Sequence, residues 1–157
     1  MNIFILDKDP VISAQMNCDS HVCKIILEVA QMMGIAHHLS GTADIPINFA
    51  KTHKNNHVSK WVRETKGNYE WAGKHGIALC QEYEFRYGKI HQYKEKIVWM
   101  CNNIPSIVPD GGLTEFTQAV AEDCYDDDPV VAYHAYYKKY KKKFAKWKNR
   151  PIPDWFK

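Results

Sequence analysis

The sequence lacks several features that would assign it quickly to a common class of protein. Only 8 of its 157 residues are glycine, and they form no GxGxxG, Walker A or GxSxG motif. Nucleotide-binding loops and serine hydrolases are therefore excluded. Apolar and polar residues almost never alternate with a period of two, no Asn-Gly pair marks a hairpin, and no internal repeat is visible. These absences predict a mostly helical, non-repetitive chain.

Cysteine, long apolar runs and metal motifs are also sparse. The five cysteines are an odd number without a CxxC pair, which indicates reduced thiols and a cytoplasmic protein. No run approaches the roughly 18 apolar residues of a membrane span, and the start, MNIFILDKDP, has no basic stretch typical of a secretory signal. His53 and His57 are four residues apart, but no HExxH accompanies them, so we expect neither a metal nor another cofactor.

The net charge of +3 is modest, but the positive charges gather at the end of the chain. Residues 138–157 hold nine lysines and arginines against one aspartate, interleaved with aromatic residues. This composition is typical of a nucleic-acid partner, although it also fits a solvated helix face whose rings turn toward the core. The residues predicted to contact nucleic acid are Lys138, Lys139, Lys141, Lys142, Lys143, Lys146, Trp147, Arg150 and Trp155.

The length and a hydrophobic content of 45% fit a single domain with a substantial core. We expect residues 1–157 to form one compact all-α domain with two long central helices and a basic, aromatic C-terminal helix. An extended segment over residues 2–6 and a loop over residues 41–56 complete the prediction. The predicted helices span residues 10–16, 18–38, 58–66, 68–88, 89–102, 114–124 and 130–148.

The first long helix carries a row of polar residues on an otherwise apolar surface. His21, Lys24, Glu28 and Gln31 recur at i, i+3, i+7 and i+10, so they lie along one edge of the helix. Polar groups on a buried helix cost free energy unless they face a cleft or each other. The row therefore indicates either a site with Glu28 as acid or base, or an ordinary Lys24–Glu28 ion pair on a solvated face.

The second long helix carries a similar row, made of Asn68, His75, Glu82 and Arg86. If the two helices packed with these rows facing, the polar groups would enclose a pocket able to bind a substrate. The alternative is ordinary amphipathicity, with Glu82 and Arg86 as an i,i+4 ion pair.

Over its whole length the chain resembles a family of small phage proteins. The shared segments are MNIFILD, NYEW (Asn68–Trp71), EYEFRYGK (Glu82–Lys89) and WKNRPIPDWF (Trp147–Phe156). More distantly, the spacing Asp19-x-His21-x6-Glu28 on a helix near the N-terminus is similar to that of the pyrimidine-dimer DNA glycosylases of the endonuclease V type. That family is small, helical and basic.

The resemblance to these glycosylases implies an N-terminal amine as nucleophile, Glu28 as the catalytic glutamate and His21 as the histidine beside it. Asn2 at the second position disfavours removal of Met1, so the nucleophilic amine would be that of Met1. An α-amine titrates near pH 8, well below lysine, so a useful fraction is free base at neutral pH. It would attack sugar C1′ in damaged duplex DNA and form a Schiff base, with Lys24, Gln31 and the second polar row binding the substrate.

Three functions are therefore weighed. The first is a glycosylase and AP lyase acting on damaged pyrimidines. The second is a non-catalytic phage protein that binds nucleic acid through its basic end. The third is a nucleotide or modified-base enzyme, or a small-ligand binder, with its pocket between the two long helices. The sequence leaves the oligomeric state open.

Overall fold

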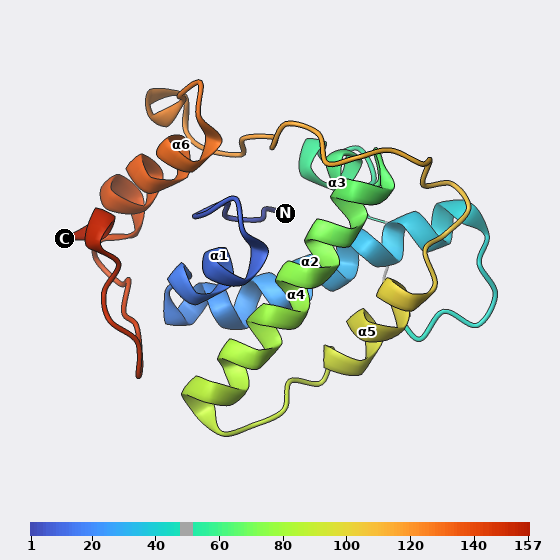
Figure 1. Ribbon diagram of the computed structural model, residues 1–157, viewed down its shortest axis with the longest axis horizontal. Helices are drawn as coiled ribbons and strands as arrows, with labels where there is room; N and C mark the ends of the chain where they lie inside the picture. Colours follow the sequence, from blue (N-terminus) through green and yellow to red (C-terminus); the bar gives the residue numbers. More distant parts are fainter. Residues whose placement is uncertain (48–51) are drawn as a thin grey trace.

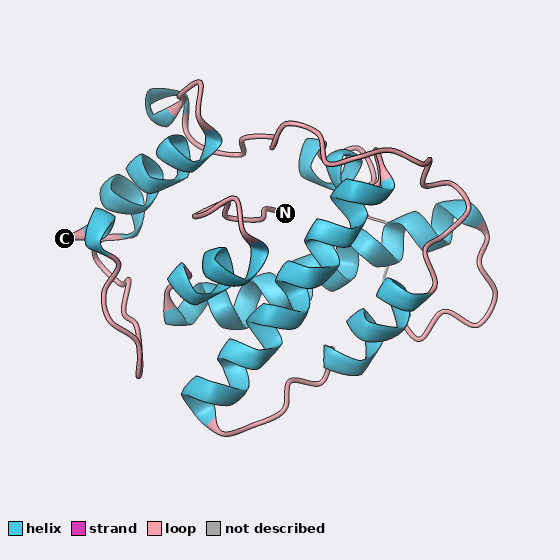
Figure 2. Ribbon diagram, viewed as in Figure 1, coloured by secondary structure: helices cyan, strands magenta, loops and turns pink. Residues whose placement is uncertain are grey.

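The structure is a computed structural model that describes residues 1–47 and 52–157. These residues contain six α-helices and no strand, as Figure 2 shows, which confirms the predicted all-α fold. The helices are α1 (Pro10–Met16), α2 (Asp19–Ser40), α3 (His57–Val62), α4 (Lys66–Tyr87), α5 (Lys94–Asn102) and α6 (Pro129–Tyr136), with short turns η1 (Glu122–Cys124), η2 (Tyr137–Lys141) and η3 (Asp154–Phe156).

Helix α1 begins where the sequence predicted it. The Asp9 carboxylate accepts hydrogen bonds from the backbone nitrogens of Val11 and Ile12, and Pro10 occupies the first turn. Helix α2 follows after two residues and ends at Gly41, whose φ of 68° lies in the left-handed region that favours glycine.

Helix α2 is the central helix of the core. Twelve of its residues are buried, including Val22, Ile25, Val29 and Met33. In the described residues it is also the one helix long and apolar enough to cross a membrane, judged by length and composition alone. A buried helix in a protein core is also apolar on nearly all sides. Here neighbouring helices enclose α2.

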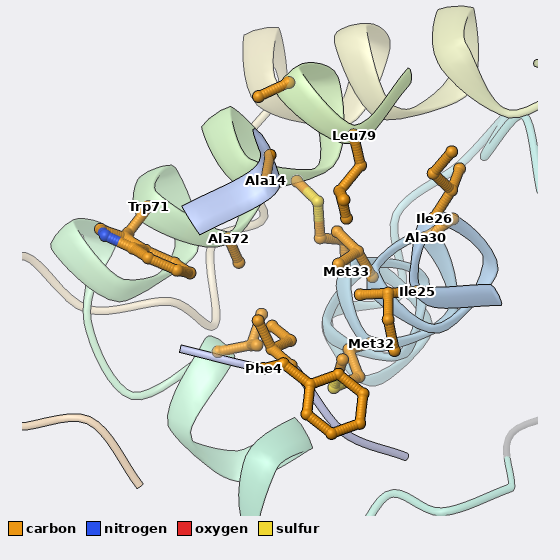
Figure 3. Packing of buried hydrophobic residues seen from close by; sticks show 14 of the residues in the cluster. Phe4, Ala14, Ile25, Ile26, Ala30, Met32, Met33, Trp71, Ala72 and Leu79 are labelled. Atoms are coloured by element: carbon orange, nitrogen blue, oxygen red, sulfur yellow. The ribbon is translucent and has the colours of Figure 1, made fainter. Parts of the chain in front are cut away.

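Helices α2 and α4 pack closely because α4 presents glycines at the contact. A Cβ atom on Gly76 would lie 2.8 Å from Val29 Cγ1, and one on Gly73 would lie 3.3 Å from Met33 Cε. Figure 3 shows the Leu79 side chain of α4 pointing toward Met33 of α2. The two long helices therefore meet through small and apolar side chains, and their polar rows lie elsewhere.

Residues 2–6 are extended, as predicted, and residues 3–6 are buried. Side chains, not a neighbouring strand, bind their backbone groups. Ser13 Oγ accepts from the Leu6 nitrogen and donates to the Phe4 oxygen, both at 3.1 Å. His134 Nε2 lies 2.8 Å from the Leu6 oxygen. These partners satisfy the backbone of a segment that lies inside the protein.

The predicted helix over residues 114–124 is wrong except for the short turn η1. Its backbone groups are bound by distant side chains: Thr114 N donates to Asn68 Oδ1 at 2.8 Å, and the Glu115 oxygen accepts from Trp61 Nε1 at 2.9 Å. Backbone groups engaged in this way cannot form the i→i+4 bonds of a helix. The segment runs extended across the molecule in Figure 1.

Three other predicted boundaries also change. The helix expected over residues 89–102 starts only at Lys94, because Gly88 ends α4 with a φ of 66°. The helix expected over residues 58–66 stops at Val62. The helix expected over residues 130–148 leaves α-geometry after Tyr136 and ends with the π-turn η2. Successive lysines four apart repel each other and disfavour a longer helix there.

The described parts of the predicted loop, residues 41–47 and 52–56, contain no helix or strand, and residues 48–51 of it lie outside the described residues. After η2 the chain turns back toward the start of the molecule. Trp147 Nε1 donates to the Met16 oxygen at 2.8 Å, and the Lys148 nitrogen donates to Asp19 Oδ1 at 2.9 Å. Both ends of the chain therefore pack near the N-terminal part of α2.

Candidate active site around Glu28

Glu28 lies next to the beginning of the chain. Its Oε2 atom accepts a hydrogen bond of 2.6 Å from the backbone nitrogen of Asn2, and its Oε1 atom lies 3.4 Å from Lys24 Nζ. The Glu28 side chain is 12% exposed, whereas that of Lys24 is 68% exposed. The carboxylate is thus sheltered on one side by the N-terminal segment, and its other oxygen pairs with an exposed lysine.

The side chain of Asn2 is held by two other segments. Asn2 Nδ2 donates to the Ala119 oxygen at 2.9 Å, and Asn2 Oδ1 accepts from Tyr133 Oη at 2.8 Å. Tyr133 Oη in turn accepts from the Ala119 nitrogen at 3.0 Å. Residue 2 is therefore fixed by α2, α6 and the extended segment together.

Met1 extends from this point toward α3. Its backbone oxygen lies 3.4 Å from Asn56 Nδ2, and its sulfur lies 3.6 Å from Ser59 Oγ. Met1 is partly buried, and these two contacts hold it beside Asn2. The first two residues are thus positioned by the fold.

His21 lies two turns before Glu28 on α2 and is 5% exposed. Its ring stacks on Phe4 with centroids 4.2 Å apart, and its Nδ1 atom lies 2.5 Å from Tyr137 Oη. Burial, with the charges of Lys141 and Lys24, lowers the pKa of His21 to about 3. The imidazole is therefore neutral at physiological pH.

An aromatic and cationic rim surrounds His21. Phe144 is 46% exposed and meets the His21 ring edge to face, with centroids 5.9 Å apart. Lys141 Nζ lies 4.9 Å from the centre of the Tyr136 ring and 5.8 Å from that of Phe144. This arrangement offers an apolar ring and a positive charge to a ligand that approaches His21.

In the described part of the chain, the two polar rows do not face each other as the predicted pocket requires. Gln31 is half-buried one turn beyond Glu28, whereas the row on α4 faces α1 and the C-terminal segment. His75 Nδ1 lies 2.9 Å from the Pro10 oxygen, and Asn68 Nδ2 donates to Thr114 Oγ1 at 2.7 Å. The rows separate because the glycine-lined contact between α2 and α4 uses other faces of both helices.

Glu82 and Arg86 form a buried charge cluster in place of a substrate site. Arg86 is 2% exposed, and it pairs with Glu82 at 3.1 Å and with Asp19 at 3.0 Å. It also donates to the backbone oxygens of Asn17 and Gln15 at 2.8 and 2.9 Å. Arg150 binds the other oxygen of Glu82 at 2.6 Å. These groups are satisfied by the protein itself and hold α1, α4 and the tail together.

The predicted nucleic-acid contacts divide into exposed and engaged residues. Lysines 138, 142, 143 and 146 are exposed, whereas Lys139 pairs with Asp123 and Arg150 with Glu82. Trp147 is buried, and the Trp155 ring stacks on His134 with centroids 3.9 Å apart. The two tryptophans therefore serve packing, and the exposed ring next to the site is Phe144.

Several site residues were missed by the sequence analysis. Asn2 contributes through its backbone nitrogen, and Tyr133, Tyr137 and Phe144 contact Asn2 or His21 although they are not among the predicted site residues. The spacing of Tyr133 and Tyr137, four residues apart on a helix, was visible and did place both hydroxyls on one side. Nothing in the sequence indicated that this side would meet the N-terminal segment.

Comparisons with protein-family models, with curated proteins and with solved structures give no match for this chain.

Proposed function

We propose that the protein is a DNA glycosylase and AP lyase whose N-terminal amine is the nucleophile and whose Glu28 is the partner carboxylate. The observation that carries the proposal is the 2.6 Å contact between the Asn2 nitrogen and Glu28. If Met1 is removed, that nitrogen is the α-amine itself, already beside the carboxylate. If Met1 is retained, the amine lies one residue away, a Cα spacing of about 3.8 Å.

The chemistry needs the N-terminal amine and Glu28, which the chain supplies, and a proton from solvent. The free amine attacks C1′ of the damaged nucleoside, and the bond from C1′ to the base breaks with its electron pair on the base, which takes up a proton from solvent. As the sugar ring opens, the amine passes one proton to O4′ through Glu28, and a protonated Schiff base remains. Glu28 then removes a proton from C2′, so that the C3′–O bond breaks and the phosphate leaves.

The surroundings of Glu28 suit these steps. A carboxylate that is mostly shielded from water stabilises the positive charge that develops on the sugar better than an exposed one does. The exposed lysines at the C-terminal end supply contacts to phosphates. Phe144 replaces Trp147 and Trp155 as the ring that stacks on a base drawn out of the duplex.

Trapping with borohydride on a duplex with one abasic site tests the proposal, because reduction turns the Schiff base into a stable adduct. We expect wild type to form the adduct and Glu28→Gln to react at least about 100-fold more slowly. Glu95→Gln, a change of the same kind at an exposed position of α5, should react like wild type. Peptide mapping of the adduct identifies the residue that bears the DNA, and intact mass reports whether Met1 is present.

A wild-type protein that forms no adduct would contradict the proposal. If that protein still bound DNA with a steep dependence on salt, the non-catalytic binding function would take its place. An adduct on a lysine side chain in place of the N-terminal residue would also contradict the assigned nucleophile.

A further inference from the structure

The hydrogen atoms around His21 can be assigned from the heavy atoms alone, beginning at Asn17. Asn17 Nδ2 donates to the Ser13 oxygen at 2.8 Å. A backbone oxygen only accepts, so the amide nitrogen must point there and Asn17 Oδ1 must point the other way. Asn17 Oδ1 is therefore a pure acceptor, and it lies 3.2 Å from Tyr137 Oη.

Tyr137 has one hydroxyl hydrogen, and its oxygen lies within hydrogen-bond distance of His21 Nδ1 and Asn17 Oδ1, with Cys18 also beside it. Burial raises the pKa of Tyr137 well above its ordinary value, so the hydroxyl keeps its hydrogen. Asn17 Oδ1 cannot donate, so that hydrogen points to Asn17, and Tyr137 Oη must accept from His21 Nδ1 at 2.5 Å. The opposite assignment would bring two oxygen lone pairs together at 3.2 Å inside the core, which is unfavourable.

The remaining ring nitrogen, Nε2, is not completely buried, although His21 as a whole is 5% exposed. In the described part of the chain, the side-chain nitrogens buried without a partner are His38 Nε2, Arg63 Nη1 and His75 Nε2. His21 Nε2 is not among them, although the hydrogen bond of the ring is made by Nδ1. Nε2 therefore keeps some contact with solvent on a ring that meets exposed Phe144 edge to face and that feels the positive charges of Lys141 and Lys24.

We propose that Asn17 and Tyr137 hold His21 as the Nδ1–H tautomer, so that Nε2 accepts a hydrogen bond from an N–H group of the nucleobase that the enzyme acts on. Its role toward the base rests on the proposed function. Tyr137 and Asn17 are positioning residues in this arrangement. The imide N3–H of thymine or uracil and an exocyclic amino group are the donors of suitable chemistry.

The neighbourhood favours a base over a phosphate as the ligand of His21. A phosphate oxygen needs a donor, and Nε2 has none in this tautomer. Lys24 and Lys141 supply positive charge for phosphates on either side, while the Phe144 ring supplies an apolar face for a base. His21 also precedes Glu28 by seven residues, about 10 Å along the helix, so the base and the sugar of one extended nucleotide could reach the two residues.

Nitrogen NMR of the histidine rings in the full-length protein tests the tautomer without any substrate. At pH 7 we expect one neutral ring with hydrogen on Nδ1 that disappears from the spectrum of His21→Gln. Tyr137→Phe removes the acceptor and should move the hydrogen to Nε2. Tyr136→Phe, the same change on the neighbouring residue, should leave the tautomer as it is. A charged ring, or hydrogen on Nε2 in wild type, would overturn the assignment.

Kinetics on two DNA duplexes test the ligand. Tyr137→Phe should cleave a duplex with a damaged thymine roughly 3- to 10-fold more slowly than wild type, the value of one hydrogen bond. Its trapping on an abasic duplex, which has no base, should be unchanged. Methylating N3 of the damaged thymine should slow wild type to a similar degree and Tyr137→Phe no further.

Equal effects on both duplexes would overturn base recognition and leave only a structural role for Tyr137. Failure of wild type to form any adduct would instead refute the proposed function, while the NMR result on the tautomer would stand independently.

Discussion

Glu28 shows how contacts determine what a single residue is able to do, and its proposed function depends on them. A carboxylate on a mostly apolar helix costs free energy of desolvation unless donors replace water. Here the Asn2 nitrogen is such a donor at 2.6 Å, and Lys24 adds an ion pair at 3.4 Å. For Arg86, the cost of desolvation is offset by the carboxylates and backbone oxygens that surround its guanidinium completely. Glu28 remains partly exposed to solvent, whereas Arg86 is fully enclosed by protein groups. Of the two, only Glu28 is therefore able to contact a substrate.

Phe144 provides a test at this scale. Its ring is 46% exposed, so Phe144→Ala should leave the free energy of unfolding nearly unchanged. Loss of stacking should weaken binding to a duplex with a damaged base by about 1–3 kcal/mol, measured by fluorescence anisotropy. Tyr125→Ala, at a 63% exposed ring in the acidic segment, is the control and should bind like wild type. Equal losses in both variants would contradict the role of Phe144.

At the scale of elements, α2 is the central helix, and its two sides contact different parts of the protein. One side packs against the glycines of α4, and the polar row faces the N-terminal segment and the residues around η2. The π-turn lies where Tyr137 and Lys141 approach His21, and such turns often accompany functional sites. The close contact with α4 therefore fixes the direction in which the polar row points.

Gly76→Val tests how much the contact between α2 and α4 contributes to stability. The added side chain would collide with Val29, since even a Cβ atom would lie 2.8 Å from Val29 Cγ1. We expect the free energy of unfolding, measured with urea, to fall by about 1–3 kcal/mol. Gln81→Val introduces the same residue at an exposed position of α4 and should change stability by less than about 0.5 kcal/mol. A neutral Gly76→Val would show that the helices can separate at little cost.

At the scale of the whole molecule, the two ends of the chain complete the structure. The first six residues lie between α2 and α6, and the tail returns to α1 and α4 through Trp147 and Arg150. The core also contains three buried histidines, His21, His37 and His75, whose pKa values burial lowers to about 3, 4 and 4. Folding therefore depends on these rings staying neutral.

This burial predicts loss of stability in mild acid. The unfolded chain binds protons on these histidines below its ordinary pKa of about 6.5, while the folded chain does so only near 3 to 4. The contribution of these neutral histidines to the free energy of unfolding is therefore complete above pH 6.5 and is lost as the pH falls toward 4. Between pH 7 and 5.5 the loss is about 1 kcal/mol for each histidine.

Urea unfolding at pH 7, 6 and 5.5 measures this dependence. His37→Gln should make it shallower, whereas His53→Gln, at an exposed position, should leave it as in wild type. Constant stability over this range would contradict the assignment of neutral rings.

Local sequence patterns predicted most of the helices, because caps and periodicity are properties of neighbouring residues. Asp9-Pro10 fixed the start of α1, and the apolar spacing of α2 and α4 identified both long helices. The prediction of a helix over residues 114–124 was wrong because side chains distant in sequence bind the backbone of this segment. These side chains are Asn68, Trp61 and Tyr133. Local propensity cannot anticipate competition from such partners.

The site divides in the same way. The sequence alone determined that His21, Lys24 and Glu28 share one edge of a helix, since 3.6 residues per turn require it. Only the tertiary structure decided what that edge faces, because the direction of the polar row depends on where α4 presents its glycines. The packing turned Glu28 toward the nitrogen of Asn2 and His21 toward Tyr137, and it closed the second row around Arg86. Periodicity sets which residues lie together on a helix, whereas long-range packing sets which groups they meet.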